Sequence, residues 1–381
     1  MDLSRRKALA LVGGGVVLAA TGGAAFAVTR QPTRALAPWA MAGAYDDPRM
    51  RALSHAILAP NPHNRQPWLV DLREPGRATL LVDTDRLLPH TDPFSRQIVI
   101  GLGCFLEVLD LAARADGQRV TMTLFPEGMP SDALDGRPVA HLDFAPGPAE
   151  ADPLFAEVPR RRTAKDPFDV SRPVDAAALP ALAAAARHGG AVGGTVDPEE
   201  VAEWRALTRE ALLVEIETPR TYKESVDLFR IGRAEIERNP DGIDFGGPLF
   251  EGLHLAGLMT REAALDTSST VHAQGVAAVL ENADTAMGHL WLVTGGNARE
   301  DQIAAGRDWV RVNLAATALG LGIHPLSQAL QEYPEMAALY AETHRRLAPE
   351  GGTVQMLARL GHAPASGPSP RWPLDAKVVR A

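Results

Sequence analysis

The sequence predicts an α+β fold made of two repeats, each with an antiparallel or mixed sheet flanked by helices. A long apolar helical pattern occurs in each half, at residues 97–115 and 309–319, and a strand pattern follows each one. Several shorter segments alternate apolar and polar residues, as strands with one solvated face do. Between the halves, residues 145–150 are rich in proline and glycine, which is the composition of a linker. We therefore expect an N-terminal repeat over residues 46–150 and a C-terminal repeat over residues 151–381.

The first thirty residues, 1–30, have the pattern of an export signal and are left out of the fold. Arg5 and Arg6 are followed by an uncharged run from Ala8 to Val28, and Ala25-Phe26-Ala27 is a cleavage site of the A-x-A type. This segment resembles a twin-arginine signal, which implies the twin-arginine export machinery as a partner. The run can also be retained as a membrane anchor, since about 20 apolar residues span a bilayer. With either outcome we expect the body of the protein to be exported, to the periplasm or another extracytoplasmic space.

Composition argues against several classes of function. The formal net charge of -9 and the sequence pI near 5.7 disfavour a broad surface for nucleic acid or anionic membranes. The single cysteine, Cys104, excludes an intramolecular disulfide, and its apolar neighbours indicate a core thiol rather than a nucleophile. The chain has no G-x-S-x-G, H-E-x-x-H, zinc-type cysteine spacing, P-loop or G-x-G-x-x-G. A hydrolase or metalloenzyme is therefore disfavoured, and no metal is expected.

Caps and periodicity give the elements of the first repeat. Asp47 and Pro48 supply an N-cap and a first-turn proline for a helix that Pro60 ends. A strand over residues 68–72 follows, and then a hairpin turn over residues 73–77. The remaining expected elements are a strand at 79–82, a helix at 97–115 and strands at 120–124 and 140–144.

The loop between that first helix and the first strand, residues 60–68, carries the clearest functional signal. Its three prolines fix φ and remove three backbone donors, while two asparagines, a histidine and a glutamine present amide and imidazole groups. Such a loop is suited to gripping a flat polar ligand. The alternative is a proline-stiffened connection that binds nothing.

The second repeat opens with a basic run at residues 160–168, whose first six residues include four cations. An isolated charge run is usually a solvated basic patch. Residues 219–250, rich in proline, glycine and charge, predict either a mobile lid or a surface excursion. We expect helices at 249–259 and 271–292, a buried helix with a glycine stop within 309–325 and a strand at 356–361. We also expect His272 and His289 to be satisfied surface or core histidines rather than ligands.

Several of these segments together resemble the FMN-dependent nitroreductase superfamily. Its Pro-Ser-x-x-Asn-x-Gln-Pro-Trp loop is matched by Pro60, Asn64, Gln66, Pro67 and Trp68, with departures at Asn61 and Pro62, where serines are usual. Residues 161–165 resemble its Arg-x-Ser/Thr-x-Lys/Arg element, and residues 313–322 resemble its NLLLAATALGLG helix and turn. Residues 370–374 are similar to its C-terminal arginine segment. The resemblance spans most of residues 46–375, and its motifs are more specific together than alone.

The resemblance implies an FMN cofactor and a role for each matched residue. Arg161 and Arg371 would grip the phosphate, Thr163 would bond to the ribityl phosphate or ring edge, and Lys165 would face N1 and the C2 carbonyl. Lys165 is then the catalytic residue, because a reduced flavin needs a cation where its negative charge collects. The backbone of residues 321–323 would cover one face of the isoalloxazine. The implied cofactor-binding set is Asn61, Pro62, His63, Asn64, Gln66, Arg161, Arg162, Thr163, Lys165, Leu321, Gly322, Ile323 and Arg371.

The resemblance also implies how the site is assembled. In the superfamily each site takes the loop from one subunit and the arginines from the other. Here the loop occurs only in the first half and the arginine elements only in the second, which implies an internal duplication, a single-chain pseudo-dimer with one composite site. The implied activity is ping-pong, two-electron reduction of nitroaromatic or quinone-like acceptors by NAD(P)H or another donor. The alternatives are a protein that binds or sequesters FMN beneath a closed lid without turnover, and a decayed site that only binds a partner.

Overall fold

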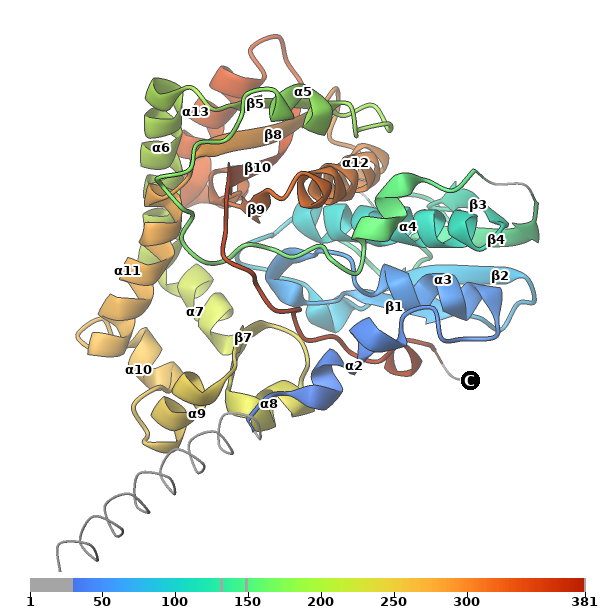
Figure 1. Ribbon diagram of the computed structural model, residues 1–381, viewed down its shortest axis with the longest axis horizontal. Coiled ribbons are helices and arrows are strands. Elements are labelled where there is room, and N and C mark those ends of the chain that lie inside the picture. The colour runs from blue at the N-terminus through green and yellow to red at the C-terminus, as the bar shows by residue number, and fades with distance from the viewer. Residues whose placement is uncertain (1–29, 131–132, 148–149, 380–381) are drawn as a thin grey trace, which may run out of the picture.

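The computed structural model describes residues 30–130, 133–147 and 150–379 (Figure 1). These residues form a mixed α+β structure with two four-stranded antiparallel sheets and one two-stranded sheet, so the predicted fold class is confirmed. The expected export signal lies almost wholly outside the described residues. Within the described ranges, no helix is both long and apolar enough to cross a membrane.

The first sheet is built from β1 (Trp68–Asp71), β2 (Arg77–Val82), β3 (Gln118–Leu124) and β4 (Ala140–Pro146), in the order β1-β2-β4-β3. It is preceded by α3 (Pro48–Ala56), and α4 (Arg96–Ala115) connects its second and third strands. As predicted, the Asp47 side chain caps α3 by accepting a hydrogen bond from the Arg49 amide, and a proline follows it. The expected elements of the first repeat are all present, with ends that differ by a few residues.

The second sheet follows the same plan. Its strands are β5 (Ala191–Thr195), β8 (Gly288–Thr294), β9 (Gly322–Pro325) and β10 (Thr353–Gly361), in the order β5-β8-β10-β9. In both sheets the chain's fourth strand lies between its second and third, and a long helix joins the second to the third; here that helix is α12 (Arg299–Ala318). The other helices around this sheet are α5 (Ala178–Ala183), α6 (Pro198–Glu217), α11 (Thr270–Asp284) and α13 (Ala337–Leu347).

The two long helices lie side by side between the sheets, and one continuous apolar core includes both helices and both sheets (Figure 1). Their closest approach is at Gly103 and Gly306, each the eighth residue of its helix. A Cβ at Gly103 would collide with the carbonyl of Ile303, and a Cβ at Gly306 would collide with the carbonyl of Ile100. The contact is therefore reciprocal, as contacts across a two-fold axis are. Cys104 is buried beside it, and burial raises the pKa of its thiol to about 12, so the predicted core thiol is confirmed.

The expected helix at 271–292 is wrong in its second half. The helix α11 ends at Asp284, and β8 begins at Gly288. Met287 and Leu290 have helical spacing from α11, but pairing with β5 and β10 on both sides puts residues 288–294 in the centre of a sheet. His289 on β8 is fully buried with neither ring nitrogen bonded, so it is not the satisfied histidine that was expected, whereas His272 meets the carbonyl of Ala264.

Residues 219–265 form an insertion between α6 and α11. It consists of α7 (Pro219–Asp227), β6 (Phe229–Ile231), α8 (Gly232–Arg238), β7 (Ile243–Phe245), α9 (Pro248–Leu255) and α10 (Arg261–Leu265). Strands β6 and β7 pair in parallel. The expected helix at 249–259 is thus shorter than predicted. The N-terminal helix α2 (Thr33–Met41) packs against α8 on the lower side of the molecule (Figure 1).

Candidate functional site

The polar loop before β1 adopts a strained backbone. His63, Asn64 and Gln66 have φ values of 47°, 50° and 50°, although none is glycine. The left-handed region is uncommon for such residues and costs on the order of 1–3 kcal/mol for each one, so the surrounding structure must impose it. Strain of this kind concentrates at functional sites.

Hydrogen bonds within the protein impose the loop conformation. The Asn61 side-chain oxygen accepts from the Gln66 amide at 2.7 Å. The Gln66 side chain is fully buried, donates to the Pro240 carbonyl at 2.7 Å and accepts from the Trp372 amide at 2.9 Å. The polar groups of Asn61 and Gln66 therefore brace the loop and tie it to the insertion. As direct cofactor ligands, both stay predictions.

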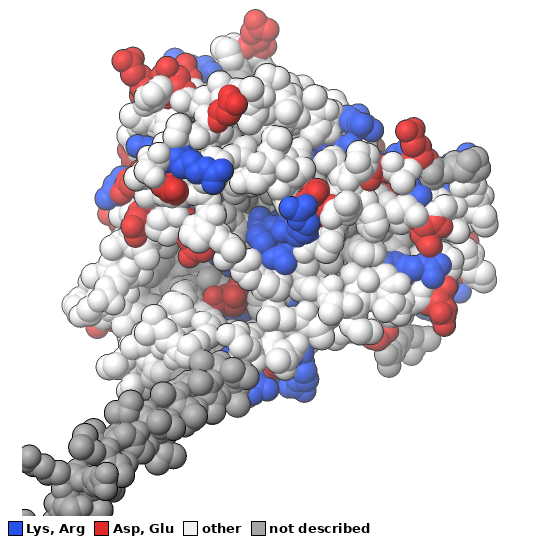
Figure 2. Space-filling model, viewed as in Figure 1, with Lys and Arg blue, Asp and Glu red and all other residues white. Residues whose placement is uncertain are grey.

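Three arginines converge where the loop meets the second half; we call Arg161, Arg162 and Arg371 the arginine cluster. Arg161 and Arg371 are buried, and the Nη1 atom of Arg161 has no hydrogen-bond partner among the described residues. Burial and the neighbouring guanidinium groups lower the pKa of Arg161 to about 10 and that of Arg371 to about 9. No member of the cluster is ion-paired with a carboxylate of the described residues. Lys and Arg side chains also gather at the centre of the face in Figure 2, over the chain that leads from η3 (Pro153–Glu157) towards α5.

The arginine cluster is held in place by the first half. Arg371 donates to the last carbonyls of α3 and its C-cap turn, from Ile57 to Ala59, and to the Asn64 side-chain oxygen at 2.6 Å. The indole of Trp39, on α2, lies 4.5 Å from the Arg162 guanidinium carbon and 5.5 Å from that of Arg371. The sequence analysis missed Trp39, because a lone tryptophan between an export signal and the first predicted helix carries no motif.

Lys165 lies on a segment that is fixed against β9. The Ala164 amide donates to the Ile323 carbonyl at 3.0 Å, and a Cβ at Gly322 would be 3.0 Å from the Cβ of Ala164. The buried Arg359 donates to the carbonyls of both neighbours of Lys165, Ala164 at 2.9 Å and Asp166 at 2.8 Å. The structure therefore brings the predicted arginine element and the predicted 321–323 backbone into direct contact.

The Lys165 ammonium group is half-exposed and lies 3.3 Å from Asp244 of β7. It is also near two histidines, since its charge contributes to lowering the pKa of His63 and His324. The Nδ1 atom of His324 lies 3.1 Å from the Arg359 Nε, which can only donate, so the proton of His324 is on Nε2. Burial, Arg359 and Lys165 lower the pKa of His324 to about 3, which keeps it neutral. His324 and Arg359 were also missed, because no motif singles them out.

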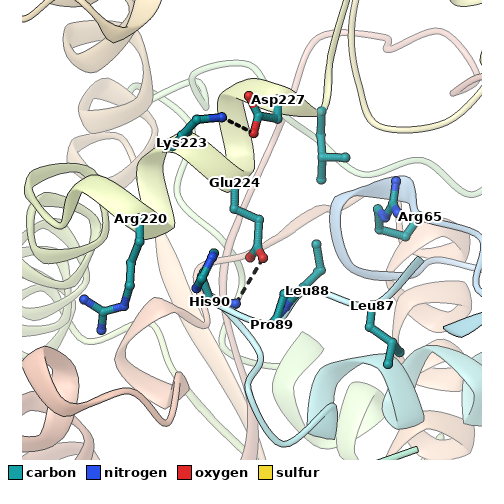
Figure 3. A pocket seen from close by; sticks show the side chains of 10 residues that line it. Arg65, Leu87, Leu88, Pro89, His90, Arg220, Lys223, Glu224 and Asp227 are labelled. Atoms are coloured by element: carbon teal, nitrogen blue, oxygen red, sulfur yellow. Dashed lines mark hydrogen bonds and ion pairs between the residues drawn. The ribbon is translucent and has the colours of Figure 1, made fainter. Parts of the chain in front are cut away.

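The loop is connected to the insertion on its other side. His63 Nε2 lies 3.0 Å from the Ser225 hydroxyl of α7, and burial lowers the pKa of His63 to about 4. Beside the same helix is a cavity of about 400 Å³, shown in Figure 3. Its charged rim is largely paired within the protein: Glu224 accepts from the backbone amides of His90 and Thr91, and Lys223 pairs with Asp227. The lining residues are Arg65, Leu87, Leu88, Pro89, His90, Arg220, Lys223, Glu224, Asp227 and Leu228.

Thr163 makes no hydrogen bond within the described residues that identifies its role. Ile323 meets the Lys165 segment through its backbone carbonyl, whereas the Leu321 amide donates to the Ala316 carbonyl of α12. Pro62 packs near Gly101 of α4, where a Cβ would be 3.2 Å from its ring. The described residues contain no group of three or more histidine, cysteine or carboxylate side chains suited to a metal ion. The site is therefore a composite of the loop, the arginine cluster, Lys165 and the start of β9.

Comparisons with known proteins extend over most of the chain. No protein-family model matches it. The chain is 28% identical over 339 residues to a Mycobacterium tuberculosis protein named "Putative NAD(P)H nitroreductase", which covers 86% of this chain and 89% of that protein. A second M. tuberculosis protein of the same name, acg, is 34% identical over 120 residues, 31% of this chain and 34% of its own. Among solved structures, an FMN-bound nitroreductase of Desulfitobacterium hafniense aligns with a TM-score of 0.34 at 18% identity, covering 61% of this chain and all of that one.

Proposed function

We propose that this protein is an FMN-dependent oxidoreductase of the nitroreductase type. The observation that carries the proposal is the arginine cluster, in which two buried guanidinium groups form no ion pair with a carboxylate of the described residues. Buried charges in proteins are normally paired, because an unpaired one loses its hydration without compensation. A phosphate dianion supplies that compensation and prefers forked guanidinium donors. The similarity to proteins named as nitroreductases over 86% of the chain supports the same assignment.

In this proposal Arg161 binds the FMN phosphate through its free Nη1 atom, and Arg162 and Arg371 add positive charge beside it. FMN held there would supply two-electron transfer chemistry between a donor and an acceptor. Lys165 places a cation at the pyrimidine end of the ring, where it stabilises negative charge. The backbone of residues 321–323 and the loop residues 61–64 hold the ring. NAD(P)H is the proposed donor, because the relatives are named as NAD(P)H nitroreductases, and nitroaromatic or quinone-like compounds are the proposed acceptors.

The test is to replace Arg161 by Met and measure both FMN affinity and stability without FMN. We expect the Kd for FMN to rise by about 10- to 100-fold, since a charge-assisted hydrogen bond contributes about 1.5–3 kcal/mol. We also expect the apoprotein to become more stable, because an uncompensated buried cation has been removed. Arg160→Met is the matched control, since the Arg160 side chain is 65% exposed and pairs with Glu157. Unchanged FMN affinity in Arg161→Met would remove the phosphate assignment.

We also propose that the two repeats form a pseudo-dimer with one FMN. The identical strand order of the two sheets and the reciprocal glycine contact between α4 and α12 support this proposal. The loop comes from the first repeat and Arg161, Lys165 and Arg371 from the second, so one composite site is expected. Titration with FMN should therefore saturate at a ratio near one per chain. Saturation near two would contradict it.

A second candidate function is FMN binding or sequestration without turnover. It is favoured by the contacts that close the insertion over the loop: Gln66 bonds to Pro240, the Gly242 amide donates to the Asn64 carbonyl at 3.3 Å, and Asp244 pairs with Lys165. Stopped-flow reduction of the FMN-loaded protein by NAD(P)H decides between the two. Reduction followed by reoxidation with a nitroaromatic or quinone indicates an enzyme, and failure of both steps indicates sequestration.

The export of the protein is a separate proposal. The paired arginines, the uncharged run and the A-x-A site support export by the twin-arginine machinery. Fusing residues 1–30 to a reporter that is active only outside the cytoplasm tests it. Signal from the native fusion that is lost in Arg5→Lys/Arg6→Lys would support the proposal, and unchanged signal in that variant would contradict it.

A further inference from the structure

The helix α9 exposes leucines and buries its charged residue, which is the reverse of an ordinary surface helix. At 100° per residue, positions 249, 252, 253, 255 and 256 share one broad face. That face contains only leucine, glycine and alanine, and its outermost residues, Leu249 and Leu255, are 67% and 66% exposed. The charged residue of the helix, Glu251, lies outside that face and is buried. A surface helix ordinarily places its charges outward and its leucines inward, so this one is made to meet something apolar.

The exposed apolar surface continues beyond the helix. Leu258 follows α9 and is 60% exposed, so three large apolar side chains are exposed within ten residues. We call Leu249, Leu255 and Leu258 the leucine patch. Isolated exposed leucines are ordinary, but a group of this kind indicates an interaction surface.

The ion pairs beside the leucine patch turn their cations outward. In the pair Arg34–Glu237 the side chains are 82% and 7% exposed, and in Arg30–Glu251 they are 39% and 8% exposed. Arg233 is also oriented in this way towards Glu237, with side chains 41% and 7% exposed. The carboxylates are therefore recessed, and guanidinium groups form the surface of α2 and α8 next to α9. Lys and Arg side chains are visible at this lower edge in Figure 2.

The run that precedes Arg30 in the sequence is uncharged. The described residues begin at Arg30, whose guanidinium lies 3.5 Å from Glu251 on α9. Residues 8–28, immediately before it, contain no charged residue. The leucine patch, the outward cations and the junction with an uncharged run thus occur together at one edge of the molecule.

We propose that this edge, the leucine patch with the cations of α2 and α8, docks on the surface of a lipid bilayer with anionic headgroups. Leucines enter the boundary between headgroups and acyl chains, while guanidinium groups bind headgroup phosphates. The local arrangement permits this although the whole chain carries a net charge of -9, because Glu237 and Glu251, which pair with these cations, are recessed. A second copy of the chain fits less well, since a symmetric contact would bring identical exposed cations together.

The test follows the environment of the leucine patch in the full chain. Leu255→Cys is labelled with an environment-sensitive fluorophore; Cys104 stays unlabelled because it is buried. We expect the emission to shift to the blue and intensify when phosphatidylglycerol–phosphatidylcholine vesicles are added. The matched control is the same label on Val170→Cys, a residue 60% exposed and outside the patch, where no shift is expected. No shift at position 255, or an equal shift at position 170, overturns the proposal.

Two further variants separate the parts of the surface. Leu249→Ser in the labelled protein should reduce the shift on every vesicle, and Arg34→Glu should reduce it only on vesicles that contain phosphatidylglycerol. Emission that is already blue-shifted before vesicles are added overturns the proposal, because the patch would then be covered. In that case, a blue shift that depends on protein concentration would indicate a second copy of the chain as the cover, and one that does not would indicate residues 8–28. None of these residues belongs to the flavin site, so failure here leaves the proposed function untouched.

Discussion

The contact between α4 and α12 allows a quantitative prediction at Gly306. Replacing Gly306 by Ala adds a Cβ where the Ile100 carbonyl and the Gly103 Cα already lie. Both are backbone atoms in the middle of a long helix, so they cannot rotate away and the helices must separate. Overpacking of this kind costs about 1–3 kcal/mol, and rigid backbone on both sides places this case near the top of that range.

The helix gains from the same substitution, because alanine is favoured over glycine by about 1 kcal/mol in a helix interior. The expected net effect of Gly306→Ala is therefore a loss of about 2 kcal/mol, or a Tm lower by about 3 °C for a chain of this length. Gly275→Ala on α11 is the matched control: it is also inside a helix, and an added Cβ meets nothing within 4 Å. That variant should be more stable than the native protein by about 0.5–1 kcal/mol.

Chemical denaturation of both variants and of Gly103→Ala measures these differences. The double variant Gly103→Ala/Gly306→Ala should lose less than the sum of the single losses, because helices already separated by one Cβ accommodate the second more easily. If Gly306→Ala is stabilised as much as Gly275→Ala, the close approach of the two helices, and with it the structural support for a pseudo-two-fold axis, is refuted.

Three further predictions concern the site. Arg359→Met should destabilise the protein by about 3–5 kcal/mol, because buried carbonyl acceptors lose their donor, and Arg359→Lys should destabilise it by less. Denaturation midpoints of the two variants measure these losses, and equal losses would contradict the prediction. Lys377 is buried, and its pKa is lowered to about 7. Between about pH 7 and its unfolded pKa, Lys377 therefore binds fewer protons in the folded than in the unfolded protein, so the free energy of unfolding should rise with pH in this range. Lys377→Met should flatten that rise. Asp244→Asn removes the carboxylate that faces Lys165, and it should speed FMN association with little change in Tm. Stopped-flow binding measures the association rate. An unchanged rate would show that the Lys165–Asp244 pair does not limit FMN entry.

Elements whose causes are local could be predicted from the sequence. Asp47-Pro48 starts α3 and Gly320, with φ of 70°, stops the helix α12, because capping and positive φ depend on a few adjacent residues. The long apolar pattern at 97–115 gave α4 within one residue. The motif resemblance also selected segments 60–66, 161–165, 321–323 and Arg371, which the structure brings to one region.

Features that depend on residues far apart in the sequence became visible in the folded chain. Residues 288–294 are a strand because β5 and β10 pair with them, which no periodicity within the segment reveals. The roles of Asn61 and Gln66 as braces depend on Pro240 and Trp372, far away in the sequence. Trp39, His324 and Arg359 enter the site only because the fold places them beside matched residues.

The arginine cluster shows the difference most clearly. In the sequence, its residues belong to an ordinary basic run and to a C-terminal segment with a single arginine. Charge runs are usually solvated. Whether such cations need a ligand depends on how much water and how many carboxylates surround them. Long-range packing sets both, because the chain folds Arg371 beneath the end of α3 and against Arg161, and leaves the Nη1 atom of Arg161 buried without a partner.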